Sequence, residues 1–202
     1  MFVQRNKARP VVAASAWVAP TAQVVGNVIV GEGCVVDYGA VLVSSGPLVR
    51  LAEGVVVGAG AVIRSVGGAH RPGFPVHVGA ESLVGPLAGC WIGAACYVAT
   101  GVMVFQGAVV GEGSRLGAGS IVHVKAALPP HSRVGMGQYA VAGGNGRAVV
   151  TSDLDEARRL LGRAGFFEHL FDDDDQADLA RLHRRATATL RAEAADWTDR
   201  PL

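Results

Sequence analysis

Three side chains capable of acid–base or anion chemistry lie within one short stretch of the sequence. Arg64, His70 and His77 fall in residues 64–77 (RSVGGAHRPGFPVH), a stretch rich in glycine and proline. Arginine binds carboxylates and phosphates through its fork of N–H donors, and histidine carries protons near neutral pH. The stretch predicts either an acid–base or anion-binding pocket, or a structural loop with surface histidines and arginines.

A fourth candidate, His123, directly follows the aliphatic residue Val122, with Lys125 nearby. Its imidazole is either a general base that activates a hydroxyl or an amine, or an exposed histidine at a turn. Glu81 and Glu112 are open to the same two interpretations, as general bases or as solvated turn residues.

The structure that must position these residues is indicated by aliphatic residues that recur every six positions. Steps of six from Val18 reach only aliphatic residues as far as Leu42, and steps of six from Ile92 do so as far as Val122. Short strands joined by tight turns have this period, whereas a helix repeats every 3.6 residues. The sequence predicts a mainly β fold, a parallel β-helix whose aliphatic residues point inward. Residues 43–50 and 64–77 are expected as loops outside the coils.

A second kind of sequence follows residue 150. Residues 1–150 carry ten basic and five acidic side chains, whereas residues 151–202 carry eight and twelve. Leucines and alanines recur at helical spacing between residues 179 and 194. We therefore expect a β-helix domain over 1–150 and a helical extension over 151–202, packed on the β-helix or on a neighbouring subunit.

Composition excludes several classes of partner. The formal net charge of +1 offers no electrostatic footprint for nucleic acid or an anionic membrane. No apolar run is long enough to span a bilayer, and the first residues lack the apolar core of a signal peptide, so export is not expected. The three cysteines, Cys34, Cys90 and Cys96, are expected to be buried thiols of a cytoplasmic protein, because a disulfide framework uses an even number. Sixteen arginines against two lysines suggest a bacterial source.

The coils resemble a known family. The segments LAEGVVVGAGAVIR (51–64), VGPLAGCWIG (84–93) and the closing LPPHSRVGMG (128–137) are similar to γ-class carbonic anhydrases, within the hexapeptide-repeat, left-handed β-helix superfamily. The resemblance covers about residues 10–150. It implies a left-handed β-helix and a homotrimer with sites between subunits.

The same resemblance implies that the zinc site of that family is missing. Its three histidine ligands fall on Arg64, Pro86 and Ala88, or on Leu83 for the second under another gap placement. Arginine does not ligate zinc because its guanidinium stays protonated. We therefore expect no metal and no carbonic anhydrase activity.

Three functions follow as hypotheses. The first is a metal-free protein that binds a small or acyl-linked ligand at the trimer interface. The second is a CoA-dependent acyltransferase or thioesterase, with His123 as base and the basic body attracting the phosphates of CoA. CoA is the one cofactor that these hypotheses admit. The third is a non-catalytic scaffold whose helical extension docks another protein.

Overall fold

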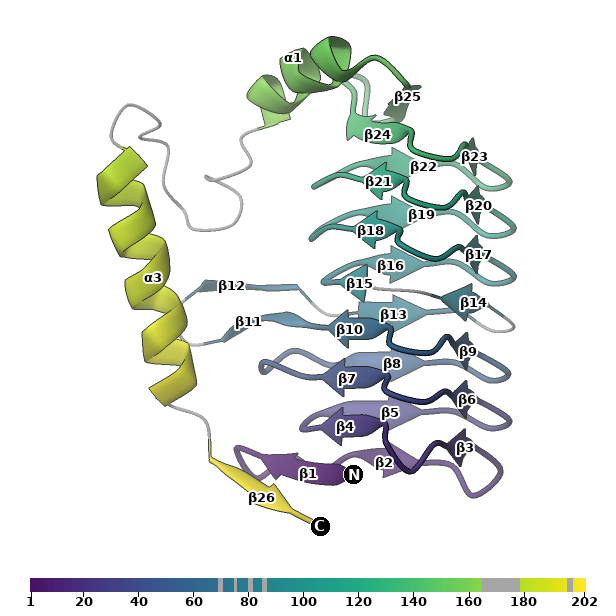
Figure 1. The fold of residues 1–202 in the computed structure, drawn as a ribbon, viewed down its shortest axis with the longest axis vertical. Helices are drawn as coiled ribbons and strands as arrows, with labels where there is room; N and C mark the ends of the chain where they lie inside the picture. Colours follow the sequence, from purple (N-terminus) through teal and green to yellow (C-terminus); the bar gives the residue numbers. More distant parts are fainter. Residues whose placement is uncertain (69–70, 75, 80–81, 85–86, 165–178, 196–197) are drawn as a thin grey trace.

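The chain folds as a parallel β-solenoid with helices at its C-terminal end (Figure 1). The computed structural model describes residues 1–68, 71–74, 76–79, 82–84, 87–164, 179–195 and 198–202. Successive strands visit three sheets in turn, so that each coil of the solenoid contributes one strand to each sheet. This architecture confirms the mainly β, parallel solenoid with C-terminal helices that the six-residue period predicts.

The three sheets run the length of the solenoid. Sheet A has ten strands: β25 (Ala148–Thr151), β24 (Tyr139–Ala142), β21 (Ile121–Val122), β18 (Met103–Val104), β15 (Leu87–Ala88), β10 (Val62–Arg64), β7 (Val41–Val43), β4 (Gln23–Val25), β1 (Phe2–Arg5) and β26 (Asp199–Pro201). Sheet B has seven: β2 (Val11–Val12), β5 (Val28–Val30), β8 (Val49–Leu51), β13 (Val76–Val78), β16 (Trp91–Ile92), β19 (Val109–Val110) and β22 (Ala127–Leu128). Sheet C has seven: β23 (Arg133–Val134), β20 (Arg115–Leu116), β17 (Tyr97–Val98), β14 (Leu83–Val84), β9 (Val56–Val57), β6 (Val35–Val36) and β3 (Trp17–Val18).

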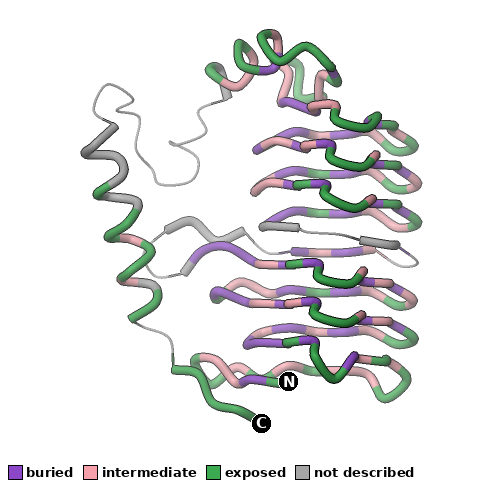
Figure 2. The backbone as a smooth tube through the Cα atoms, viewed as in Figure 1, coloured by how far each residue is buried: buried purple, intermediate pink, exposed green. Residues whose placement is uncertain are grey.

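The aliphatic residues of the repeat fill the interior of the solenoid. Leu42 and Ile63 from sheet A, Leu51 from sheet B and Leu116 from sheet C are each at most 1% exposed. Parallel registers place identical positions directly above one another, so the core is a stack of aliphatic layers. The three cysteines are buried thiols in the same core, as expected. Figure 2 shows the alternation of buried and exposed positions along each coil.

Glycine is required where neighbouring coils approach most closely. Gly79, Gly93 and Gly111 each follow the inward residue of a sheet B strand. A Cβ at these positions would lie 2.3–2.5 Å from backbone atoms of the next coil. The coils pack so tightly at this corner that any larger residue must push them apart.

Both interruptions of the repeat leave the solenoid at the corner between sheets A and B. Residues 44–48 connect β7 to β8, whereas residues 65–75 connect β10 to β13. The longer insertion is not simply a loop, because it contains the antiparallel hairpin of β11 (Val66–Gly68) and β12 (Arg71–Phe74). The last part of the expected loop, including His77, belongs to β13 of the solenoid.

The C-terminal part begins with α1 (Leu154–Ala164), whose N-terminus is capped by the Asp153 carboxylate. Helix α3 (Leu179–Ala195) then stands beside the solenoid, on the side toward which β11 and β12 project (Figure 1). Strand β26 returns to the first coil and pairs antiparallel with β1. No helix among the described residues is long and apolar enough to cross a membrane.

Candidate functional site

A column of side chains on the outer face of sheet B forms the best candidate site. Arg50, His77 and Trp91 each precede the inward residue of their strand, and they are direct neighbours in the parallel ladder β8–β13–β16. Adjacent strands lie about 4.8 Å apart, so the three side chains emerge next to one another. The imidazole of His77 lies against the indole of Trp91, with ring centroids 4.5 Å apart and planes 33° apart.

These side chains line a groove of about 510 Å³. Gly79, Gly93, Gly111 and Glu112 also line it, and the glycines contribute backbone without side chains. The lining residues come from several neighbouring strands of sheet B and the turns after them, so the groove crosses several coils.

The groove is lined by two groups of opposite charge, Arg50 and Glu112. Arg50 lies on β8, whereas Glu112 follows β19, three strands further along sheet B. At about 4.8 Å per strand, the backbones of β8 and β19 are about 14 Å apart. Between them, Trp91 and Val109 are half exposed, at 53% and 44%, and present apolar surface. An elongated ligand with an anionic end and an apolar middle fits this arrangement.

The surroundings of His77 favour its neutral form. Partial burial lowers the pKa of His77, and the positive charge of Arg50 lowers it further. A neutral imidazole at pH 7 has a lone pair available to accept a proton, which is what a general base needs. Arg50 therefore has two roles in the groove, as an anion-binding group and as the charge that keeps His77 neutral.

Arg64 does not share this site. Arg64 lies on β10 of sheet A, and its Nε donates a hydrogen bond to Ser45 Oγ at 3.2 Å. Ser45 in turn donates its backbone N–H to Ser65 Oγ, and Ser45 and Ser65 are both buried. His70 lies outside the described residues. The structure thus places Arg64 and His77 on different sheets.

His123 follows β21 on sheet A and is also distant along the fold from His77. Its ring stacks on Phe105, with centroids 5.0 Å apart and planes 11° apart. Burial lowers the pKa of His123. The stacked, half-buried ring differs from the exposed turn histidine that was one of the two interpretations of the sequence.

The described residues contain no group of three or more histidine, cysteine or acidic side chains placed to hold a metal ion. Pro86 lies outside the described residues, and Ala88 pairs through its backbone with Arg64. The absence of a zinc site therefore stays a prediction from the sequence.

Protonation of the two partly buried histidines is expected to reduce stability as the pH falls. Because the pKa values of His77 and His123 are lowered on folding, the unfolded chain binds more protons below about pH 6.5. The free energy of unfolding should then rise with pH across this window and fall on acidification. Urea unfolding at pH 5.5, 6.5 and 7.5 measures it.

The matched variant for this prediction is His123→Gln, which removes one of the two titrating groups. It should show a shallower fall in unfolding free energy between pH 7.5 and 5.5 than the wild type. Equal slopes in the two proteins, or a wild type that gains stability in acid, would contradict the prediction.

Sequence reasoning found His77 and named Glu112, but it missed Arg50 and Trp91. Arg50 precedes Leu51, and Trp91 precedes Ile92, so both occupy the outward position before an inward residue of the repeat. The outward position of both residues could be read from the repeat, and outward residues of one sheet form a column. However, the hairpin makes the sequence separation between Arg50 and His77 differ from that between His77 and Trp91. The sequence therefore did not show that these three residues belong to the same column.

Comparison with known proteins gives likenesses of fold. No family model matches the chain, and no curated protein does. A proposed acetyltransferase from Bacillus cereus is 18% identical, with a TM-score of 0.48, over 94% of this chain and 93% of that one. A UDP-N-acetylglucosamine O-acyltransferase from Moraxella catarrhalis is 18% identical, with a TM-score of 0.43, over 94% and 96%.

A hexapeptide transferase family protein from Anaplasma phagocytophilum is 20% identical, with a TM-score of 0.38, over 95% and 93%. At these identities and TM-scores, the likenesses assign no activity to this chain. Any function must be argued from the groove itself.

Proposed function

We propose that the groove on sheet B binds an anionic, acyl-linked small molecule, with an acyl-CoA thioester as the expected class. The observation that carries this proposal is the imidazole of His77 held against the ring of Trp91, with Arg50 one strand away. Arg50 binds an anionic group of the ligand, and the apolar surface of Trp91 and Val109 accommodates its uncharged part.

The same groups support acyl transfer to a hydroxyl or an amine, or hydrolysis by water. His77 takes the proton of the attacking hydroxyl, amine or water as its oxygen or nitrogen bonds to the thioester carbonyl carbon. The carbon–sulfur bond of the resulting tetrahedral intermediate then breaks, and the protonated His77 returns the proton to the departing sulfur. Glu112, which also lines the groove, binds a hydroxyl or ammonium group of the acceptor in this proposal. His77 replaces His123 as the base in this proposal, because His77 lines the groove.

The proposal includes a homotrimer with the groove at a subunit boundary. Half-exposed apolar side chains on all three faces of the solenoid support association: Trp91 on sheet B, Tyr97 on sheet C and Met103 on sheet A. Light scattering coupled to size exclusion measures the assembly. Kinship with γ-class carbonic anhydrases remains an expectation from sequence, and the bond of Arg64 to Ser45 supports a structural role at the first ligand position.

Ligand binding should depend on Arg50. In titration calorimetry with acetyl-CoA, Arg50→Ala is expected to weaken binding about 10- to 150-fold, because one charge-assisted hydrogen bond contributes about 1.5–3 kcal/mol. The matched control is Arg115→Ala, which removes an exposed arginine from sheet C, outside the groove.

Two results would contradict this prediction. One is an absence of binding by the wild type at millimolar acetyl-CoA, and the other is equal weakening in Arg50→Ala and Arg115→Ala. The second result would mean that CoA senses only the overall charge of the solenoid.

A further inference from the structure

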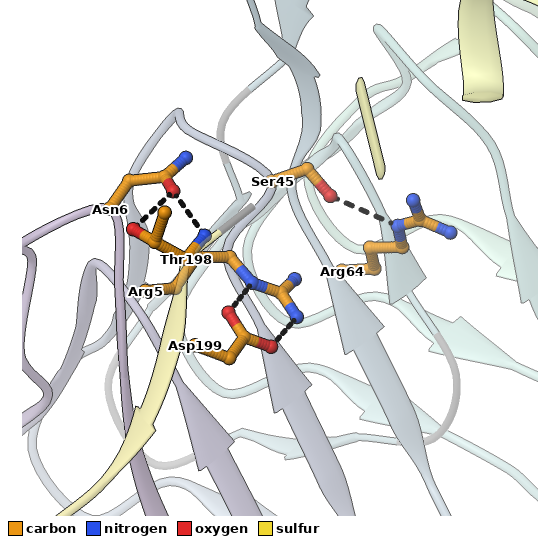
Figure 3. Close-up of polar contacts among 6 residues, drawn as sticks. All are labelled: Arg5, Asn6, Ser45, Arg64, Thr198 and Asp199. Atoms are coloured by element: carbon orange, nitrogen blue, oxygen red, sulfur yellow. Dashed lines mark hydrogen bonds and ion pairs between the residues drawn. The ribbon is translucent and has the colours of Figure 1, made fainter. Parts of the chain in front are cut away.

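The edge of the first coil holds an extended segment by contacts with its side chains as well as its backbone. Strand β26 pairs antiparallel with β1, with Arg5 opposite Asp199. The Arg5 guanidinium donates two hydrogen bonds to the Asp199 carboxylate, at 2.7 Å from Nε and 2.6 Å from a terminal nitrogen (Figure 3). A bidentate pair of this kind fixes both the position and the orientation of the carboxylate.

Asn6 recognises the preceding residue. Its Oδ1 accepts hydrogen bonds from the backbone N–H of Thr198 at 2.9 Å and from the Thr198 hydroxyl at 3.3 Å. The backbone N–H of Asn6 donates to the Thr198 carbonyl. Asn6 has a φ of 49°, in the left-handed region that asparagine tolerates better than most residues, and this conformation turns the chain beyond β1. Arg5 and Asn6 therefore contact both side chains of the extended pair Thr198 and Asp199.

The two charged groups of this pair are buried to different degrees. With β26 docked, the Arg5 side chain is 11% exposed, whereas that of Asp199 is 41% exposed. A guanidinium with so little exposure requires a paired anion, because desolvation of an unpaired charge is costly. In the docked arrangement the Asp199 carboxylate supplies that anion.

Helix α1 packs on β24 and β25. Within the part of α3 that the structure describes, no strand has an extensive backbone contact with the helix. Arg184, Leu190 and Arg191 of α3 are exposed. The lower end of α3 is attached to the solenoid through β26, which follows it closely in the chain (Figure 1).

We propose that the edge of β1, with Arg5 and Asn6, is a specific docking site for an extended Thr-Asp segment. Its occupant is Thr198–Leu202 of the same chain, and this segment acts as a releasable latch that sets the position of α3. Docking follows the rules of β-strand addition, in which the backbone ladder gives affinity and the side chains give specificity. Release of the latch frees α3 and exposes the β1 edge together.

A disulfide tests whether docking occurs within one chain. The backbone bonds of Asn6 to Thr198 and of Leu202 to Phe2 make Arg5 and Asp199 the closely spaced, non-hydrogen-bonded pair between them. In the full chain carrying Arg5→Cys and Asp199→Cys, mild oxidation is expected to give an intrachain disulfide. An interchain disulfide, or none, would overturn the assignment.

Trypsin cleavage of α3 tests whether the latch controls the helix. Asp199→Asn in the full chain is expected to accelerate cleavage after Arg184 and Arg191 about tenfold, because cleavage follows the population of the released arm. The matched control is Arg200→Ala, on the same strand and exposed, which should stay within about twofold of the wild type. The charge-exchanged pair Arg5→Asp with Asp199→Arg should restore slow cleavage.

Unchanged cleavage in Asp199→Asn, or equal acceleration in Arg200→Ala, would overturn the latch. Circular dichroism separates release from global unfolding, and the solenoid of Asp199→Asn is expected to keep its β spectrum. Loss of that spectrum would also overturn the proposal, because a latch is dispensable for the fold.

Discussion

Replacement of His77 by glutamine is expected to lower kcat for acyl transfer or thioester hydrolysis by about 10²- to 10⁴-fold, the usual contribution of a positioned general base. Glutamine retains a polar group of similar size beside Trp91 but does not take up a proton at neutral pH. Binding of acetyl-CoA should change little, because Arg50 and Trp91 remain. Single-turnover rates and calorimetric Kd values measure the two quantities separately.

The pH dependence of the wild type gives the second measurement for His77. Since burial and Arg50 lower the pKa of His77, kcat/KM should fall only below the ordinary range of histidine. Arg50→Ala should move this fall to higher pH. The matched control is His131→Gln, in the turn after β22, which should retain wild-type kcat. An active His77→Gln protein with an unchanged pH profile would rule out His77 as the base.

Replacement of Gly111 by alanine is expected to destabilise the solenoid by about 3 kcal/mol or more, at the upper end of the cost of overpacking. The added Cβ would lie 2.3 Å from the backbone nitrogen of Pro130 and 2.5 Å from the carbonyl carbon of Pro129. Backbone atoms do not move aside as a flexible side chain does, so two coils must separate. Urea unfolding monitored by circular dichroism measures the loss.

The matched control for this change is Gly144→Ala, in the turn between β24 and β25, where an added Cβ meets nothing within 4 Å. Its stability should stay within about 0.5 kcal/mol of the wild type, as for most surface substitutions. An equally small change in the stability of Gly111→Ala would contradict the prediction, because it would mean that the two coils can separate at little cost.

The sequence predicted the interior of this fold better than its exterior. Inward positions such as Leu42 and Ile92 follow a strict period because each must fill the same narrow space in every coil. Outward positions face solvent or a groove, so their residue types vary without breaking the period. Arg50, His77 and Trp91 can act together because they lie on adjacent strands of sheet B. The six-residue period does not reveal this pairing, because the hairpin insertion interrupts the repeat between Arg50 and His77.

The docking of residues 198–202 on the first coil could not be predicted from the sequence, for a different reason. Thr198 and Asp199 have no apolar pattern and form a strand only because β1 offers a paired edge and Arg5 offers a counter-charge. Their partners are 192–194 residues away, so no local signal marks them. The division between residues 1–150 and 151–202 remains a proposal, and β26 shows that the second part returns to the first coil.

Sheet A ends in an antiparallel strand at both extremities, with β25 on β24 and β26 on β1. Every other pairing along this sheet is parallel. The antiparallel strands thus interrupt the repeat and cover the sheet A edge of each terminal coil. They take the place of capping elements in this sheet, where the bare edge of a coil would offer unpaired backbone groups to another chain.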